Sequence, residues 1–194
     1  MPSMSSPSSC VPGVQARARG PERAGLPRPL AVGALWAALA LPALAEPAAG
    51  PCPAPAGPPL IQLRTAGKAL QGCDLKGLMA LPEREVSTTL PRELGIAGKH
   101  RWTGVSLKRL VERLGGGPAD TVQLGALNDY TVTIPWSDLQ QYDPVLAYQR
   151  GGQAMSVRDK GPLILIYPFD AHPGLRTQNY VNRTIWQVNA LTLK

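Results

Sequence analysis

The chain has 194 residues, three cysteines, two histidines and a formal net charge of +7, enough length for one domain preceded by a leader. Its basic residues are dispersed, with no run and no interleaved aromatic residues, which argues against nucleic-acid binding. The two cysteines of the predicted mature chain, Cys52 and Cys73, and the two distant histidines lack the spacing of metal ligands. A metal site among them is therefore not expected.

The first 45 residues read as a secretory signal peptide. Four arginines supply a basic flank, and residues 30–45 form an apolar segment too short to span a membrane comfortably. The segment ends in Ala43-Leu44-Ala45, a small-x-small pattern that predicts cleavage before Glu46. An uncleaved membrane anchor is the alternative. No paired arginines precede the apolar run, which disfavours a twin-arginine signal.

A proline-rich linker follows over residues 46–59 and contains Cys52. Because Cys10 leaves with the leader, Cys52 and Cys73 are the cysteines that remain, in an oxidising compartment if the chain is exported. A disulfide that ties the linker to the domain is the best use for two exported cysteines. Their spacing in the sequence does not fix the geometry that such a bond needs, so an unbonded pair is the alternative.

The domain is predicted over residues 60–194. It opens with a strand over residues 60–64 and a short helix over residues 74–80. Thr and Val over residues 85–90 favour a second strand, because both residue types suit a pleated sheet. Residues 91–99 are predicted to be irregular.

Residues 100–135 carry the clearest periodicities. One apolar helix face is formed by residues at positions i, i+3, i+4 and i+7, which are Leu107, Leu110, Val111 and Leu114. Ser106 is the expected N-cap, and the run of glycines over 115–117 ends the helix. Alternating residues over 122–126 and 130–134 predict two half-buried strands. The turn between them contains Asn128 and Asp129, which tolerate left-handed backbone.

Short elements follow this stretch. Residues 136–140 indicate a helix capped by Ser137. Residues 145–149 and 153–155 flank Gly151-Gly152, which is typical of a hairpin.

The last part of the chain completes the predicted sheet. Residues 163–167 are apolar throughout, as in a fully buried strand. Residues 169–182 are expected to form a loop, and residues 185–193 the final strand, with Trp186 in the core. Strands with a few short helices predict the α+β class, with a mostly antiparallel or mixed sheet.

Seven short motifs follow one another along the domain. They are Trp-x-Gly-Val-x-Leu-x-x-Leu from Trp102, Ala-Leu-Asn-Asp-Tyr ending at Tyr130, Ile134-Pro135, Leu146-Ala147, Gly151-Gly152, Arg158-Asp159-Lys160-Gly161-Pro162 and Trp186-Gln187-Val188. In order and spacing they resemble the molybdopterin-binding domain of the sulfite oxidase superfamily. The resemblance is closest to its short, exported, single-domain branch, which includes pterin-binding proteins that regulate membrane cyclic-di-GMP enzymes. It implies the sulfite oxidase-type molybdopterin-binding fold.

The resemblance also bears on the metal. In the molybdenum enzymes of the superfamily, a Cys thiolate in the loop before the Trp-x-Gly-Val motif binds molybdenum. The corresponding residues 87–101 contain no Cys, so the metal would lack its protein ligand and oxo-transfer chemistry its anchor. Molybdenum is therefore not expected and no cofactor is required, whereas a pterin remains a candidate ligand.

The resemblance brings distant residues to one ligand mouth, and these are Thr88, Trp102, Asn128, Asp129, Tyr130, Arg158 and Lys160. Asp129 is the carboxylate candidate for the amino and ring N–H groups of a pterin, or else a plain turn former. Trp102 and Tyr130 either stack on the pterin or fill the core. Arg158 and Lys160 suit a ring carbonyl or an anionic side chain, and a solvated loop is the alternative. Thr88 either lines the ligand mouth or is an ordinary strand residue.

The sequence predicts no hydrolytic chemistry, because His100 and His172 have no Ser or Cys partner in a recognisable nucleophile motif. The favoured reading is an exported, periplasmic binding protein for a pterin-like small molecule, without turnover of its own. It would act as a sensor through a membrane-bound partner, for which the resemblance suggests a cyclic-di-GMP enzyme with an exported domain. A molybdopterin-dependent oxidoreductase and a ligand-free periplasmic adaptor are the alternatives.

Overall fold

The computed structural model of this chain describes residues 50–65 and 68–194. The leader predicted over residues 1–45, with its cleavage site, and the first part of the linker lie outside the described residues. No helix within the described ranges is long and apolar enough to cross a membrane.

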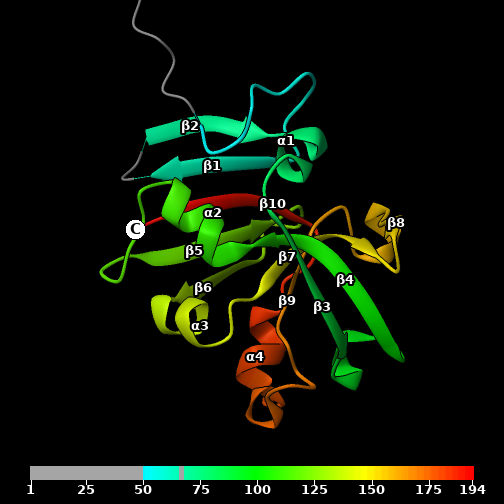
Figure 1. Ribbon diagram of the computed structural model, residues 1–194. Helices are drawn as coiled ribbons and strands as arrows, with labels where there is room; N and C mark the ends of the chain where they lie inside the picture. The colour runs from blue at the N-terminus through cyan, green and yellow to red at the C-terminus, as the bar shows by residue number, and fades with distance from the viewer. Residues whose placement is uncertain (1–49, 66–67) are drawn as a thin grey trace, which may run out of the picture. The chain divides into compact units, whose positions relative to one another are not determined.

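Two five-stranded sheets form the domain (Figure 1). The first has the order β2-β1-β10-β5-β6. Its strands are β1 (Ile61–Thr65), β2 (Lys68–Cys73), β5 (Thr121–Ala126), β6 (Thr131–Pro135) and β10 (Val188–Leu193). All its pairings are antiparallel except that of β1 with β10, which is parallel. The first sheet is therefore mixed and mostly antiparallel, as expected, but the strands are divided between two sheets rather than forming one.

The second sheet has the order β3-β4-β7-β8, with β9 paired to β7. Its strands are β3 (Glu83–Thr89), β4 (Lys99–Ser106), β7 (Val145–Arg150), β8 (Gln153–Ala154) and β9 (Ile164–Ile166). The register of β4 on β7 shifts between Thr103 and Gly104. At Gly104 a Cβ would overlap the carbonyl oxygen of Leu146, so only glycine allows the two strands to approach this closely.

Short helices connect the strands. They are α1 (Leu75–Met79), α2 (Leu107–Arg113), α3 (Trp136–Gln141) and α4 (Gln178–Arg183), with 3₁₀ turns η1 (Arg92–Leu94), η2 (Val157–Asp159) and η3 (Pro173–Leu175). The predicted start of α2 is confirmed, because the Ser106 hydroxyl accepts a 3.1 Å hydrogen bond from the Arg109 amide. Its apolar face lies in the core, where Leu107, Leu110 and Val111 are buried.

Several predicted elements are wrong or incomplete. Residues 169–182 are not a plain loop, because they contain η3 and most of α4. Ser137 does not cap α3: the cap position is Pro135, and no side chain bonds to the helix start. Strands β2 and β4 were not predicted, and β10 begins at Val188, later than expected.

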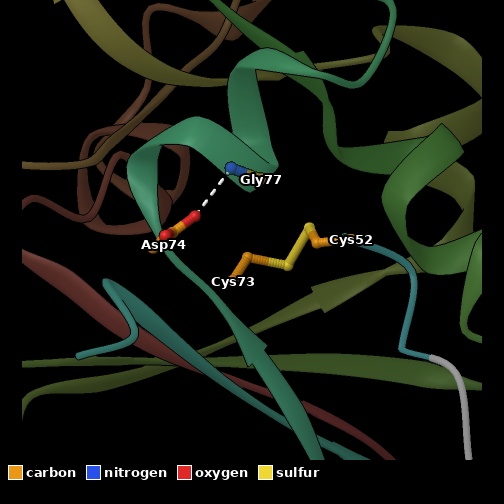
Figure 2. Close-up of a disulfide and its surroundings, with 4 residues drawn as sticks. All are labelled: Cys52, Cys73, Asp74 and Gly77. Atoms are coloured by element: carbon orange, nitrogen blue, oxygen red, sulfur yellow. Dashed lines mark hydrogen bonds between the residues drawn. A yellow bond between two sulfur atoms is a disulfide. The ribbon is translucent and has the colours of Figure 1, made fainter. Parts of the chain in front are cut away.

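A disulfide between Cys52 and Cys73 joins the linker to the end of β2 (Figure 2). Their Cα atoms are 5.6 Å apart, and both cysteines are buried. The neighbouring Asp74 caps α1 by accepting a 2.7 Å hydrogen bond from the Gly77 amide, and it accepts a 2.9 Å bond from the Ala56 amide of the linker. These backbone bonds, that of Gly77 first, hold the pKa of Asp74 below its usual value. The linker is therefore fixed to the domain at two adjacent points.

Candidate functional site

A cavity of about 360 Å³ opens between the β5–β6 turn, helix α4 and the segment that precedes β10. Polar and aromatic groups on its wall come from Glu93, Asn128, Tyr130, Gln178, Asn182, Thr184 and Trp186. Apolar groups come from Leu94, Val181 and Ile185. A volume of this size, with apolar walls and a few polar groups, is typical of small-molecule sites.

The β5–β6 turn supplies one side of the cavity. Asp129 has a φ of 64°, as the sequence predicts for a turn of this composition. The Asn128 side-chain oxygen accepts a 3.3 Å bond from the Tyr130 amide. The Tyr130 hydroxyl donates at 3.1 Å to the carbonyl of Asn182 on α4, so it bridges the two sides. Asn128 and Tyr130 line the cavity, whereas Asp129 at the tip of the turn is exposed and does not line it.

Trp186 supplies an aromatic wall, and Lys160 lies against it. The Lys160 Nζ is 4.1 Å from the centre of the Trp186 ring, within the range of a cation–π contact. The Lys160 carbonyl accepts a bond from the Gln187 amide at 3.1 Å, which fixes the two segments together. The structure thus packs Lys160 against Trp186, a wall residue, although Lys160 itself does not line the cavity. Arg158, on η2, is exposed and does not line the cavity.

The position of Trp186 differs from the one predicted from the sequence. It was predicted to fill the core, but it is only partly buried and one of its surfaces forms the cavity wall. The β10 strand begins two residues later, at Val188, so Trp186 precedes that strand, and it forms an isolated β-bridge with Ile164 of β9.

A buried carboxylate lies behind α4. The Oδ2 atom of Asp138, on α3, accepts a 2.8 Å bond from the Tyr167 hydroxyl and a 2.8 Å bond from the Arg183 guanidinium. The Asp138 side chain is 5% exposed and that of Arg183 is 20% exposed, so this ion pair is shielded from solvent screening. Burial, followed by the charge of Asp138, raises the pKa of Tyr167 far above its usual value.

Aromatic rings surround this ion pair. Tyr180 of α4 packs edge-on against Tyr142 and Tyr167, with ring centres 5.6 Å and 5.4 Å away. His172 packs on the other side of Tyr142 at 5.2 Å. The hydrogen bond with Tyr142, together with burial, raises the pKa of Tyr180 to about 12. Tyr167 and Tyr180 therefore stay uncharged near neutral pH beside the Asp138–Arg183 pair.

The structure does not bring Thr88 and Trp102 to the same mouth. Thr88 is fully buried on β3, and its hydroxyl accepts a 3.0 Å bond from the Asp170 amide. Trp102 is fully buried on β4, where Arg150 lies 6.0 Å from its ring centre. Neither residue lines the cavity. The burial of Trp102 thus agrees with the prediction that it fills the core, although its indole Nε1 has no hydrogen-bond partner among residues 50–65 and 68–194.

Residues of α4 form a wall of the cavity that the sequence analysis did not predict. Gln178, Val181 and Asn182 come from a segment expected to be a loop. The available signal was Pro173 and Leu175 followed by Thr177, a residue type that often begins a helix. The Thr177 side chain makes no cap bond, and six residues with no buried side chain give no apolar stripe to detect.

Comparison with known protein families identifies the family of this domain. A model of the protein family described as the oxidoreductase molybdopterin binding domain matches residues 70–184. The match includes the β5–β6 turn and α4, and it ends just before Trp186. No curated protein matches the sequence.

Proposed function

The chain belongs to the family of molybdopterin-binding domains of the sulfite oxidase type, and we propose that this member is an exported, non-catalytic binding protein for a pterin-like molecule. The cavity between the β5–β6 turn and α4 is the proposed site. Ligand occupancy would be passed to a membrane-bound partner, for which a cyclic-di-GMP enzyme with an exported domain is the candidate that the resemblance suggests.

The observation that carries this proposal is the composition of the cavity wall. A pterin is a flat aromatic ring system with hydrogen-bond donors and acceptors around its edge. The faces of Trp186 and Tyr130 suit the ring. The side-chain amides of Asn128, Gln178 and Asn182 offer both donors and acceptors to its edge. Asp129 keeps its proposed role as a carboxylate at the rim of the same turn.

The donor set does not fit the molybdenum that the family implies. Resemblance to its enzymes calls for a Cys thiolate, but Cys52 and Cys73 are joined to each other, and Cys10 lies outside the described residues. No group of three potential metal-ligating side chains occurs in residues 50–65 and 68–194. The described domain therefore has no free thiolate that could hold molybdenum.

Export is supported by the disulfide, since such bonds persist in oxidising compartments and are rare in the cytosol. The leader, with its small-x-small pattern at Ala43-Leu44-Ala45, supports the same compartment. N-terminal sequencing of protein from the exported fraction tests this part of the proposal. We expect a chain that begins at Glu46, and an intact leader in the membrane fraction would contradict it.

Calorimetric titration with reduced and oxidised pterins tests the ligand. Replacing Trp186 by Leu should weaken binding about tenfold or more, because stacking of a flat heteroaromatic ring on an aromatic side chain is worth roughly 1–3 kcal/mol. Trp102→Phe is the matched control: it changes a buried tryptophan away from the cavity, so it should lower the melting temperature and leave affinity unchanged. Asp129→Ala tests the proposed carboxylate, and unchanged affinity in this variant would remove that role alone.

Two other results of the pterin titration and of elemental analysis would favour a different function. Absence of pterin binding together with about one molybdenum per chain, in protein made by a host that synthesises the cofactor, would favour the oxidoreductase. Absence of both would favour the ligand-free adaptor.

A further inference from the structure

Helix α4 is a part of the cavity wall with little burial of its own. It has six residues, none of them buried, and its N-cap Thr177 makes no side-chain bond to the helix. A helix this short does not persist in water by itself. The position of α4 therefore depends on contacts that its residues make with the rest of the domain.

The chain on both sides of α4 is anchored. Before it, Leu175 is buried and the Arg176 guanidinium donates to the Asp170 carboxylate at 2.8 Å. After it, Thr184 is buried and the carbonyl of Ile185 accepts a 2.8 Å bond from the Leu165 amide. A movement of α4 is thus confined to residues 177–183, between the anchors at Arg176 and Thr184.

Besides Val181, which is partly buried against the core, side-chain contacts hold α4 at three places. The Tyr130 hydroxyl reaches across the mouth to the Asn182 carbonyl. The Arg183 guanidinium is paired with the buried Asp138 carboxylate. Tyr180 packs into the aromatic cluster beside that pair. All three can separate without breaking a sheet hydrogen bond.

We infer that α4 is a hinged cover over the cavity and that Arg183 and Asp138 are the positioning pair that holds it closed. Ligand exchange then requires release of this pair and of the Tyr130 bridge. The identity of the ligand rests on the proposed function, but the opening of α4 is a property of the ligand-free domain. Low-stability segments of this kind supply the lids of many binding sites.

Hydrogen–deuterium exchange on the ligand-free protein tests the cover. Amides of α4 should exchange much faster than those of α2, which has three buried residues. Arg183→Met should speed exchange in α4 at least about tenfold, because a hydrogen bond to a charged group is worth about 1.5–3 kcal/mol, and it should leave α2 unchanged. Arg183→Lys, which keeps the charge, should restore part of the protection.

Tyr167→Phe is the matched control. It removes the other hydrogen bond to the same Asp138 oxygen, but it keeps the aromatic ring against which Tyr180 of α4 packs. It should leave the exchange of α4 close to that of the wild type. Equal acceleration by Tyr167→Phe and Arg183→Met would overturn the assignment of the positioning pair, and so would α4 exchange as slow as that of α2 in the wild type.

Tyr130→Phe tests the bridge without touching the core, because Tyr130 is 45% exposed. It should speed exchange in α4 but not in α2. With a pterin as the probe, stopped-flow mixing should show faster association and faster dissociation, whereas loss of a simple contact would change dissociation alone. If no pterin binds while the exchange pattern is as expected, the ligand proposal fails and the cover stands. Unchanged exchange in Tyr130→Phe would remove the bridge.

Discussion

At the level of single residues, Gly104 gives the sharpest test of the fold. The nearest atoms to a Cβ added there are backbone atoms of Leu146 and Ala147, which cannot rotate away as a side chain can. We expect Gly104→Ala to destabilise the domain by about 1–3 kcal/mol or more, the usual cost of overpacking. Urea unfolding of the purified variant would measure this loss.

Gly117→Ala is the matched control for that substitution. A Cβ at Gly117 meets nothing within 4 Å, so this variant should unfold within about 0.5 kcal/mol of the wild type, as surface substitutions usually do. Equal stability of the Gly104 and Gly117 variants would contradict the close approach of β4 and β7.

Single residues also show what sequence reasoning can and cannot place. Asp129 was predicted at a turn because its residue type tolerates left-handed backbone, and its φ is 64°. Trp102 and Trp186 carry the same side chain, yet Trp102 is buried in the second sheet and Trp186 lines the cavity. Their different surroundings depend on strand pairing between distant segments, which a local pattern does not contain.

At the level of elements, the linker and β2 are joined by the Cys52–Cys73 disulfide across a sequence separation of 21. Replacing both cysteines by serine removes the cross-link from the unfolded chain. The chain-entropy model puts the resulting loss of stability at roughly 3 kcal/mol for a loop of this length. Urea unfolding of the double variant against the wild type measures it.

The thiol content of the wild type supplies the control. Exported protein denatured without reductant should show no reactive thiol from Cys52 or Cys73. Two reactive thiols would contradict the bond, and a double variant as stable as the wild type would show that the linker is restrained by other contacts, such as the bond from Ala56 to Asp74.

The elements that the sequence predicts differ from those it does not predict in how many apolar side chains they bury. Helix α2 and strands β5 and β6 were predicted because their apolar residues recur at helical or strand spacing and face the core. Helix α4 has no buried residue, so it leaves no periodic signal and depends on tertiary contacts. The cavity follows the same division, since its β5–β6 wall was expected and its α4 wall was not.

At the level of the whole molecule, stability should fall in alkali. The pKa of Tyr180 is raised from 10.0 to about 12 by its hydrogen bond with Tyr142 and by burial, and burial raises that of Tyr167 further. A raised pKa means that the folded state keeps protons that the unfolded state loses above pH 10. This contribution is therefore complete below pH 10 and is lost as the pH rises toward 12.

Urea unfolding at a series of pH values tests this prediction. The free energy of unfolding should decline between pH 10 and 12 in the wild type and decline less steeply in Tyr180→Phe, which has no phenol to ionise. Parallel curves for the two proteins would show that Tyr180 does not govern the alkaline limit.

The order of strands in the first sheet sets when this protein folds. Strand β10 lies between β1 and β5, although it comes from residues 188–193 (Figure 1). Until β10 has been synthesised, no strand joins the β1–β2 pair to the β5–β6 pair. The pairing of β10 with β1 connects residues far apart in the sequence, and pairings of this kind form slowly. A chain threaded through a membrane during synthesis would thus arrive with this sheet still open. Under the export proposed above, late closure would keep the polypeptide in the unfolded form that a narrow translocation channel requires.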